Sequence, residues 1–453
     1  MKKSLLFSSC RLMLLLALSI LSIFGSCEKN DNPGVPDTKG DPADVAFDWI
    51  KMQQKLLVGI PGILPHVAGR TYAYVGLALY ESVVPGMSEY QSIAPQLNGG
   101  LVLPKADAGN QYHWPASANA ALAHMLRNLL PHAAPALVAG IDSLEAHHKK
   151  QFESIVDAET IKRSAEFGRQ IAAAIFEWSK SDGAHEAYKS PFSDTYVPPT
   201  GAGKWVSTGE FPFSQPAYPF WGNNRTFVPD IAEATQPPPP PEYSEAPGSA
   251  FYEAVNEIYT MSQSLTREDS LTARFWAYVP LDPEAPAKHG DVSHAANIAM
   301  QAMVEKAFSL QDAAVLFCKH GIAGNEAGIS CVRAKFFYNL VRPITYIRTV
   351  MGHTTWKPVI LTPPFPEYTS GHAAVSMSYA AVLEATFGKN FAFTDHSFAD
   401  SYGPRNFDSF EAYAKEAAFS RLLGGIHYRF AMDEGLKQGR KTAEKVLQLK
   451  FKR

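Results

Sequence analysis

The sequence of 453 residues has few cysteines and no excess of charge of one sign. Its 41 lysines and arginines nearly balance its 44 aspartates and glutamates, and the net charge is -3. No run of basic residues stands out, which argues against nucleic acid as a partner. Alternation of polar and apolar residues, the pattern of a half-buried strand, is also scarce. The composition is nevertheless globular, with 46% hydrophobic residues, so we expect a folded protein that is not built on sheets.

Long apolar runs are absent beyond the first 27 residues. Lys2, Lys3 and Arg11 precede or flank an apolar run from Leu12 to Phe24, which is too short for a comfortable membrane span. We therefore interpret residues 1–27 as a secretion signal and expect the remaining chain to be soluble. The signal ends in Phe-Gly-Ser-Cys27, which is similar to the lipobox of bacterial lipoproteins, although these usually have an aliphatic residue in place of the phenylalanine.

The lipobox similarity implies that Cys27 carries lipid and anchors the chain in a bacterial cell envelope, at the periplasmic or the surface face. An ordinary cleaved signal is the alternative. Cys10 would be lost with the signal, which leaves Cys318 and Cys331. Both lie in apolar helical pattern, where buried free thiols are common, so we expect two free cysteines in the core.

The composition changes along the chain and divides it into regions. Residues 28–44 are polar with proline and glycine, as in a flexible tether. Residues 45–246 form an N-terminal helical region that ends in an arm (181–246) rich in proline, glycine and aromatic residues. Such a long irregular segment is usually functional or packed, and we read the run 237–241 as a rigid spacer. Residues 247–453 form a C-terminal helical region, which carries all the chemistry that we find.

Apolar residues at spacings of three and four predict an all-α fold, a helical bundle with this irregular arm. A capping box at Ser309–Asp312 marks one helix start. The predicted helices are 45–58, 70–83, 116–130, 134–157, 160–179, 249–260, 267–278, 293–308, 311–340, 370–387, 410–423 and 433–449.

Three short segments carry the residue types of an anion site. In the first, Lys335 and Arg342 are seven residues apart, so we expect them on one face of a helix that Pro343 ends. In the second, Ser370 and Gly371 begin a helix, where backbone N–H groups and the helix dipole favour an anion. His372 follows in the first turn and can face the same anion.

The third segment holds Arg421 and His427, which share no face of a regular helix unless Gly424-Gly425 breaks it. Taken singly, each segment has a purely structural reading: an exposed helix pair, an N-cap beside a surface histidine, or a core histidine. Together they supply about three fixed positive charges and two histidines. This set suits a tetrahedral oxyanion, with one histidine as nucleophile or ligand and the other as acid–base group.

In this order the three segments resemble the signature of the superfamily that joins vanadium-dependent haloperoxidases and type 2 phosphatidic acid phosphatases. Trp356 and the run from Pro363 to Tyr368 are similar to the soluble haloperoxidase branch. The resemblance implies that Lys335, Arg342 and Arg421 bind the equatorial oxygens of vanadate or phosphate, with Ser370 and the N–H of Gly371. It further implies that His372 is the acid–base group and that His427 bonds vanadium, or attacks phosphorus in a phosphatase.

The sequence departs from the family pattern at a few positions. Ala431 stands where the family has an acidic residue, and Asp433 or Glu434 is a nearby substitute. Thr369 replaces a common proline, a harmless change. Phe365 stands where chloride-oxidising members have phenylalanine, which favours a haloperoxidase, whereas Val332 replaces the aromatic residue of several haloperoxidases and argues the other way.

Three functions therefore remain open from the sequence. The first is a haloperoxidase with vanadate as cofactor and with hydrogen peroxide and a halide as substrates. The second is a secreted acid phosphatase without a cofactor, acting on a phosphate ester through a phosphohistidine at His427. The third is a lipid-anchored helical protein that binds nutrients without catalysis. For either enzyme we expect His372 to titrate near neutrality and to give a bell-shaped pH profile. We expect His147-His148 to lie on a solvated helix face, with a metal site there as the alternative.

Overall fold

Helices dominate the structure, a computed structural model that describes residues 38–60, 63–210, 214–277 and 291–453. The predicted all-α fold is confirmed, because the only sheet within these ranges has two antiparallel strands, β1 (Phe393–Asp395) and β2 (Arg405–Phe407). Among these residues no helix combines the length and the apolar character that crossing a membrane requires. The predicted signal, the predicted lipidation site at Cys27 and most of the predicted tether lie outside the described residues.

The helices predicted in the N-terminal region are all present, with shifted ends. The second begins at Pro65 rather than Arg70, because proline suits the first turn of a helix. The fourth ends at Phe152, short of the predicted Asp157, since Asp157 is the N-cap of the next helix and accepts a hydrogen bond from the Thr160 N–H. The helices are α1 (Asp44–Gly59), α2 (Pro65–Val83), α3 (Trp114–Leu129), α4 (Pro135–Phe152), α5 (Ala158–Ser179) and α6 (Ile231–Ala234).

The C-terminal region also has its predicted helices, including the capping box at Ser309 and Asp312. Helices α6, α11 and α13 were not predicted, because segments this short show no apolar repeat. The helices are α7 (Ala250–Ser262), α8 (Arg267–Phe275), α9 (Asp291–Glu305), α10 (Leu310–Tyr338), α11 (Pro343–Thr349), α12 (Gly371–Phe387), α13 (Ala399–Tyr402), α14 (Phe410–Leu423) and α15 (Arg429–Leu447).

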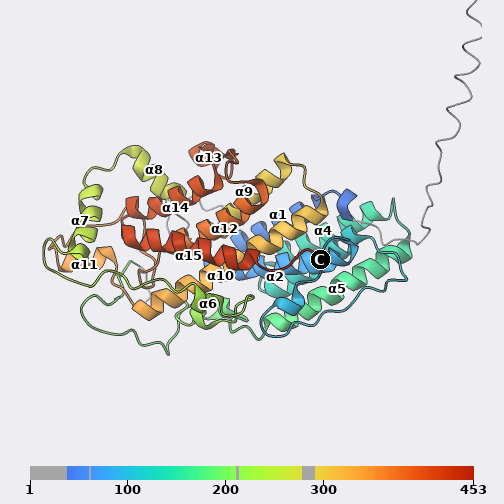
Figure 1. Ribbon diagram of the computed structural model, residues 1–453, viewed down its shortest axis with the longest axis horizontal. Helices are drawn as coiled ribbons and strands as arrows, with labels where there is room; N and C mark the ends of the chain where they lie inside the picture. Colours follow the sequence, from blue (N-terminus) through green and yellow to red (C-terminus); the bar gives the residue numbers. More distant parts are fainter. Residues whose placement is uncertain (1–37, 61–62, 211–213, 278–290) are drawn as a thin grey trace, which may run out of the picture. The chain divides into compact units, whose positions relative to one another are not determined.

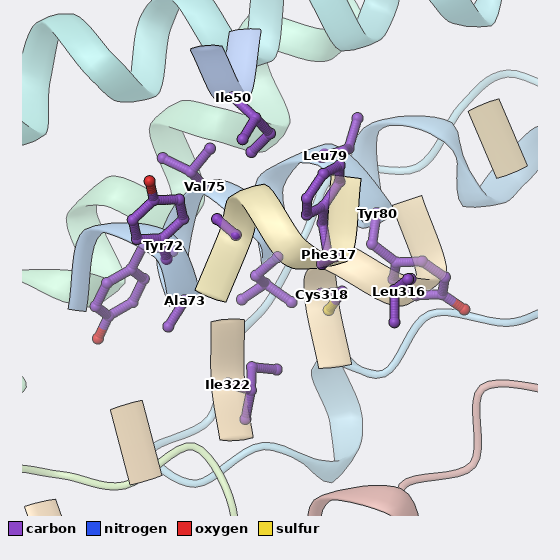
Figure 2. Close-up of a cluster of buried hydrophobic side chains, with 14 of the residues drawn as sticks. Ile50, Tyr72, Ala73, Val75, Leu79, Tyr80, Leu316, Phe317, Cys318 and Ile322 are labelled. Carbon is purple, nitrogen blue, oxygen red and sulfur yellow. The ribbon is translucent and has the colours of Figure 1, made fainter. Parts of the chain in front are cut away.

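Helices α2 and α10 pack together at the centre of the hydrophobic core. Figure 2 shows side chains of α2, such as Tyr72, beside those of α10, such as Phe317. A Cβ atom on Gly76 would lie 2.5 Å from the Phe317 carbonyl oxygen, and one on Gly321 would lie 2.5 Å from that of Tyr72. The two backbones are therefore too close for any residue but glycine at these positions. This contact holds α10 in place, and the C-terminal end of α10 carries Lys335.

Helix α15 packs equally closely against α12, and both lie beside α10 (Figure 1). A Cβ atom on Gly439 would lie 2.0 Å from the carbonyl oxygen of Ala374, and one on Gly435 would lie 2.8 Å from that of Ser370. The start of α12 is thus fixed by the backbone of α15, and this is the place where Ser370, Gly371 and His372 stand.

The irregular arm (181–246) packs against α10, as its aromatic content predicts. Trp205 and Phe227 are buried. The Trp205 N–H donates to the Asn339 carbonyl at 2.8 Å, and the Phe227 N–H donates to Glu326 Oε1 at 2.7 Å. The arm is therefore tied to the helix that leads into the site.

The proline run in this arm is docked rather than free. The Tyr338 hydroxyl donates to the Pro237 carbonyl at 2.8 Å, and the Tyr368 hydroxyl donates to that of Pro238 at 2.7 Å. Both tyrosines flank site segments, since one ends α10 and the other precedes α12. The rigid spacer expected from the sequence thus lies against the site's own loops.

Two expectations about the N-terminal region need correction. Thr38, in the last part of the predicted tether, is fully buried, and the Asp41 carbonyl accepts a hydrogen bond from the Leu310 N–H at 2.8 Å, so this last part is folded against the body. His148 is buried rather than solvated, since its ring packs on Phe152. Only His147 is exposed, and among the described residues the pair belongs to no cluster of three potential metal ligands.

The two cysteines of the folded body behave as predicted. Cys318 and Cys331 are both buried, and both are free thiols. Cys318 belongs to the contact between α2 and α10 (Figure 2), whereas Cys331 lies four residues before Lys335 in the wall of the site.

Candidate active site

Lys335 and Arg342 converge on the site from two different helices, not from one as the spacing predicted. Asn339 takes a left-handed conformation (φ 51°) that ends α10, and Pro343 then begins α11 with Arg342 as its N-cap. The two cations still meet. Lys335 Nζ and Arg342 Cζ each lie 5.2 Å from the centroid of the Phe365 ring.

Lys335 is buried and holds the loop that leads into α12. Its ammonium group donates to the carbonyls of Pro366, Glu367 and Thr369. Burial lowers its pKa to about 8, and the nearby Arg342 adds to this effect. Lys335 therefore places positive charge in the cavity wall while its N–H groups shape the loop.

Arg342 is fully buried and is only partly satisfied by the protein. Its Nε donates to the Phe365 carbonyl at 2.8 Å, and its Nη1 donates to the Ile426 carbonyl at 2.9 Å. Nη1 also lies 3.4 Å from His427 Nε2. Its Nη2 is buried without a hydrogen-bond partner among the described residues. An unpaired buried N–H is costly, so an acceptor for this group would stabilise the site.

The predicted helix start is present at α12. Ser370 is its N-cap, and its Oγ accepts from the Ala373 N–H at 3.5 Å, while Gly371 is the first helical residue. His372 Nε2 lies 3.0 Å from the carbonyl oxygen of Trp276, at the end of α8. Burial lowers the pKa of His372 well below its ordinary value, and the guanidinium of Arg421 lowers it further.

The third segment changes direction at the pair Gly424-Gly425. Arg421 ends α14 and donates to the Ala273 carbonyl at 3.1 Å. Gly425 adopts φ +78°, which only glycine takes easily, and the chain reverses to bring His427 to the cavity. Burial and then the charges of Arg342 and Lys335 lower the pKa of His427 well below its ordinary value.

A carboxylate that the motifs did not assign holds His427. Glu367 is fully buried, and its Oε1 lies 2.7 Å from His427 Nδ1 and accepts from the Tyr428 N–H at 3.0 Å. Because Oε1 is already an acceptor, Nδ1 carries the hydrogen and donates it. The neutral imidazole then keeps its lone pair on Nε2, the atom beside Arg342.

Glu367 is also the carboxylate that supports His427 in place of the acidic residue that the family has where this chain has Ala431. Ala431 is fully buried at the start of α15, and its carbonyl accepts from the Ser370 N–H at 3.0 Å. Of the two substitutes considered, Asp433 is exposed and Glu434 pairs with Lys437 at 2.7 Å. Neither supports His427. Burial raises the pKa of Glu367 to about 7, although Arg342 and Lys335 lower it.

One cavity of about 170 Å³ joins most of the predicted residues. Arg342 and Ser370 are fully buried and do not form part of its lining. Its cationic and histidine side is lined by Lys335, Gly371, His372, Arg421 and His427. Its apolar side includes Phe365 and Val332 together with side chains of the arm and of the first turn of α2.

Comparison with known proteins places this geometry in a family. The family described as "VCPO second helical-bundle domain" matches residues 315–452, which include all seven predicted anion-site residues. The solved structure of the first bacterial vanadium-dependent iodoperoxidase is 32% identical to the chain and covers 90% of it and 96% of its own length, with a TM-score of 0.79. The chain belongs to the vanadium-dependent haloperoxidase family.

Two further structures share the fold of this haloperoxidase-family chain. They are the holo and apo forms of a bacterial vanadium-dependent chloroperoxidase, 16% and 15% identical, with TM-scores of 0.66 and 0.67. They cover 87% and 91% of the chain, and 95% and 98% of their own length is matched. A search of curated proteins gives no match. The family resemblance predicted from the three motifs is confirmed, and the chain is an enzyme rather than a nutrient-binding protein.

Sequence reasoning missed several residues around this haloperoxidase site. Glu367 lies within the quoted run from Pro363 to Tyr368, but nothing in that run relates it to a histidine 60 residues later. Trp276 acts through its backbone carbonyl, which any residue supplies, so no residue type marks it. His66 and Trp221 come from distant segments and carried no spacing signal at all.

Proposed function

We propose that the chain binds vanadate and oxidises a halide with hydrogen peroxide. The observation that carries this proposal is the pair formed by His427 Nε2 and Arg342. Glu367 fixes the tautomer that leaves a lone pair on Nε2, and a guanidinium with an unpaired N–H lies next to it. The lone pair on Nε2 can bond the central atom of an oxyanion, and the neighbouring N–H can donate a hydrogen bond to one of its oxygens.

The residues present fit vanadate by charge and by hydrogen-bond capacity. Lys335 and Arg421 line the cavity, and Arg342 lies behind its wall beside His427, so three cationic side chains compensate the burial of an anion. The unpaired Nη2 of Arg342 would gain an acceptor. The start of α12 adds the Ser370 hydroxyl and the Gly371 N–H at the positive end of a helix dipole.

Each residue of the site would have the role that the family resemblance implies. His427 would be the ligand of vanadium, with Lys335, Arg342, Arg421, Ser370 and Gly371 around the oxygens. When bound, vanadate supplies the electrophilic activation of peroxide. His372 would move the proton of peroxide, because it lies in the same cavity and is neutral at neutral pH in the protein alone. The apolar side of the cavity limits the access of water to the oxidant.

Iodide is the halide that we propose first. It is the easiest of the halides to oxidise, and the 32% identical relative is described as an iodoperoxidase. Phe365, which packs against both Lys335 and Arg342, gives the halide an apolar wall. Replacement of Phe365 by another residue would test whether this side chain contributes to halide selectivity.

We also propose that the enzyme is lipid-anchored in the cell envelope through Cys27. The support is the similarity of the segment around Cys27 to a lipobox. Metabolic labelling with palmitate tests this proposal, because the label should be lost in Cys27→Ser. A labelled Cys27→Ser variant, or an unlabelled wild type, would rule it out.

The experiment that tests the catalytic proposal compares two reactions in one preparation. Protein incubated with orthovanadate is assayed for peroxide-dependent oxidation of iodide, bromide and chloride, and protein without vanadate is assayed for hydrolysis of 4-nitrophenyl phosphate. Vanadate-dependent iodide oxidation with little ester hydrolysis supports the proposal. Ester hydrolysis that vanadate inhibits, without halide oxidation, would instead establish the phosphatase.

A further inference from the structure

The C-terminal end of α8 supplies two backbone carbonyls to the site. The Ala273 carbonyl accepts from Arg421 Nη2 at 3.1 Å, and the Trp276 carbonyl oxygen lies 3.0 Å from His372 Nε2. Because a carbonyl oxygen can only accept, Nε2 of His372 carries the hydrogen and donates it. The neutral imidazole then has its lone pair on Nδ1, which is the ring nitrogen that can accept the proton of peroxide.

The side chain of Trp276 is buried and held by three neighbours. Its indole ring stacks on the ring of His294, with centroids 4.8 Å apart, and lies 6.1 Å from the ring of Tyr413. Its Nε1 donates to Glu416 Oε1 at 2.8 Å. The indole therefore has little freedom to move, and the carbonyl of the same residue is fixed with it.

His294 forms a buried pair with Asp395. Its Nε2 lies 2.5 Å from Asp395 Oδ2, and both side chains are almost fully buried. Burial alone would raise the pKa of Asp395, but the hydrogen bond with His294 and then those with Ser397 lower it to about 2. The ionised carboxylate thus holds the His294 ring in the orientation that stacks on Trp276. Neither member of the pair lines the oxyanion cavity.

The two-stranded sheet restrains the same end of α8 a second time. Asp395 in β1 and Arg405 in β2 are paired in the register of the sheet. Arg405 Nη1 donates to Glu416, the partner of the Trp276 indole, and its Nη2 donates to Thr272 Oγ1 at 2.9 Å. Each strand therefore supplies one charged side chain that helps to fix the end of α8.

From these contacts we propose that His294 and Asp395 are positioning residues for His372, and that they act through Trp276. The pair fixes the indole, the indole fixes the carbonyl of its own residue, and the carbonyl fixes the tautomer and the orientation of the His372 ring. This inference rests on the proposed function for the role of His372 as the acid–base group. A buried hydrogen-bonded pair also rigidifies a fold, so the test needs a readout at His372 itself.

The tautomer of His372 is tested first, at pH 7 in the protein without vanadate. NMR of the full chain with nitrogen-labelled histidine should show the His372 hydrogen on Nε2, and His372→Asn identifies the signals. In His294→Gln the amide can still donate to Asp395, but no ring stacks on Trp276, so His372 should give a mixture of both tautomers. Unchanged His372 signals in His294→Gln, or a wild type with the hydrogen on Nδ1, would overturn the proposal.

His148→Gln is the matched control for this experiment. His148 is also a buried histidine beside an aspartate, since its Nε2 lies 3.4 Å from Asp48, but it does not line the cavity. The control should leave the His372 signals unchanged, even where it lowers the melting temperature.

Two substitutions of Asp395 carry the test if His294→Gln does not fold. Asp395→Leu has a similar volume but no acceptor, so it should give the same mixture of His372 tautomers. Asp395→Asn keeps an acceptor oxygen for His294 and should retain most of the Nε2 tautomer. Wild-type signals of His372 in Asp395→Leu would overturn the proposal.

Kinetics tests the same link in the vanadate-loaded enzyme. At saturating vanadate, His294→Gln should lower kcat for iodide oxidation about tenfold to hundredfold, because a misplaced acid–base group loses much of its effect. The KM for iodide should stay close to that of the wild type, since His294 does not line the cavity. A wild-type kcat in His294→Gln, or an equal loss in His148→Gln, would overturn the proposal. If the wild type does not oxidise iodide, the proposed function fails, whereas the NMR experiment still decides whether His294 positions His372.

Discussion

Glu367 Oε1 lies 2.7 Å from His427 Nδ1, although the two residues are 60 positions apart in the chain. The carboxylate is fully buried, and the histidine points its other nitrogen towards Arg342. Pairs of this kind fix the tautomer and the ring orientation of a metal-binding histidine. In this family member the support comes from the loop before α12 and not from the helix that follows the histidine.

Loss of Glu367 should weaken the oxyanion site without abolishing the fold. In Glu367→Ala we expect about a 10–100-fold loss of vanadate affinity, measured by calorimetry, because His427 loses the acceptor that fixes its tautomer. Glu367→Gln keeps an acceptor oxygen and should retain most of the affinity. Asp433→Ala, which removes an exposed carboxylate six residues after His427, is the control and should change nothing. Equal losses in the Ala and Gln variants would show that charge, not positioning, is the role of Glu367.

His372 should take up a proton when an oxyanion binds. Burial and Arg421 hold its pKa well below the ordinary value, so the imidazole is neutral at pH 7 before binding. A nearby anion favours the charged form and raises this pKa. Vanadate titrations at pH 7 in two buffers of different ionisation enthalpy should therefore report more proton uptake by the wild type than by His372→Asn. Identical uptake in both proteins would exclude His372 as the group that titrates.

The same pKa shift revises the expected pH profile. A bell-shaped profile was predicted from a His372 that titrates near neutrality, whereas the protein alone holds this pKa well below that range. The bell shape near neutrality therefore depends on the charge of the bound anion. This prediction is checked by the pH dependence of iodide oxidation in the vanadate-loaded enzyme.

The contact between α12 and α15 should tolerate no side chain at Gly439. A Cβ atom there would lie 2.0 Å from the Ala374 carbonyl oxygen, so Gly439→Ala must push the helices apart. We expect a loss of about 2–4 kcal/mol in the free energy of unfolding, measured with urea, and a weaker site because α12 moves. Gly328→Ala, where an added Cβ meets nothing within 4 Å, should change stability by about 1 kcal/mol or less. Equal effects of the two substitutions would contradict the close approach of α12 and α15.

Glu326 ties the arm to α10 and should make stability depend on pH. Its Oε1 accepts from the Phe227 N–H, and burial raises its pKa from 4.5 to about 8. Between pH 4.5 and 8 the folded state holds this proton and the unfolded state does not, so the contribution of Glu326 to stability falls as pH rises through this window.

The isosteric change Glu326→Gln removes this dependence. At pH 5 the variant should match the wild type, and at pH 8.5 it should be more stable by about 1 kcal/mol or more. Thermal melts at the two pH values measure the difference. A gap between the variant and the wild type that stays constant with pH would mean that Glu326 is already ionised in the folded protein.

The residues proposed to bind the oxyanion could be selected from the sequence because they occur at short, fixed spacings. Gly371 and His372 follow Ser370 directly, and the glycine pair before His427 marked the turn that Gly425 makes. The prediction that Lys335 and Arg342 lie on one helix was wrong, because Asn339 adopts a left-handed conformation that ends the helix. The two cations nevertheless lie beside the same aromatic ring.

The remaining parts of the site depend on tertiary contacts that leave no local pattern. His66 stands in the first turn of α2, and Trp221 stands in the arm, more than a hundred residues before the motifs. The sequence predicted that the arm packs, because its aromatic residues need burial. The sequence could not indicate that the arm packs against α10 and lines the cavity, because an irregular segment has no periodicity from which its packing partner can be inferred.

Vanadium content and iodide oxidation, measured together in the wild type and in His427→Ala, test the central claim most directly. The account predicts that the wild type retains about one vanadium per chain after gel filtration and oxidises iodide only with peroxide, whereas the variant loses both properties while its circular dichroism stays unchanged. A wild type that binds no vanadium, or a His427→Ala variant that oxidises iodide as fast as the wild type, would contradict it.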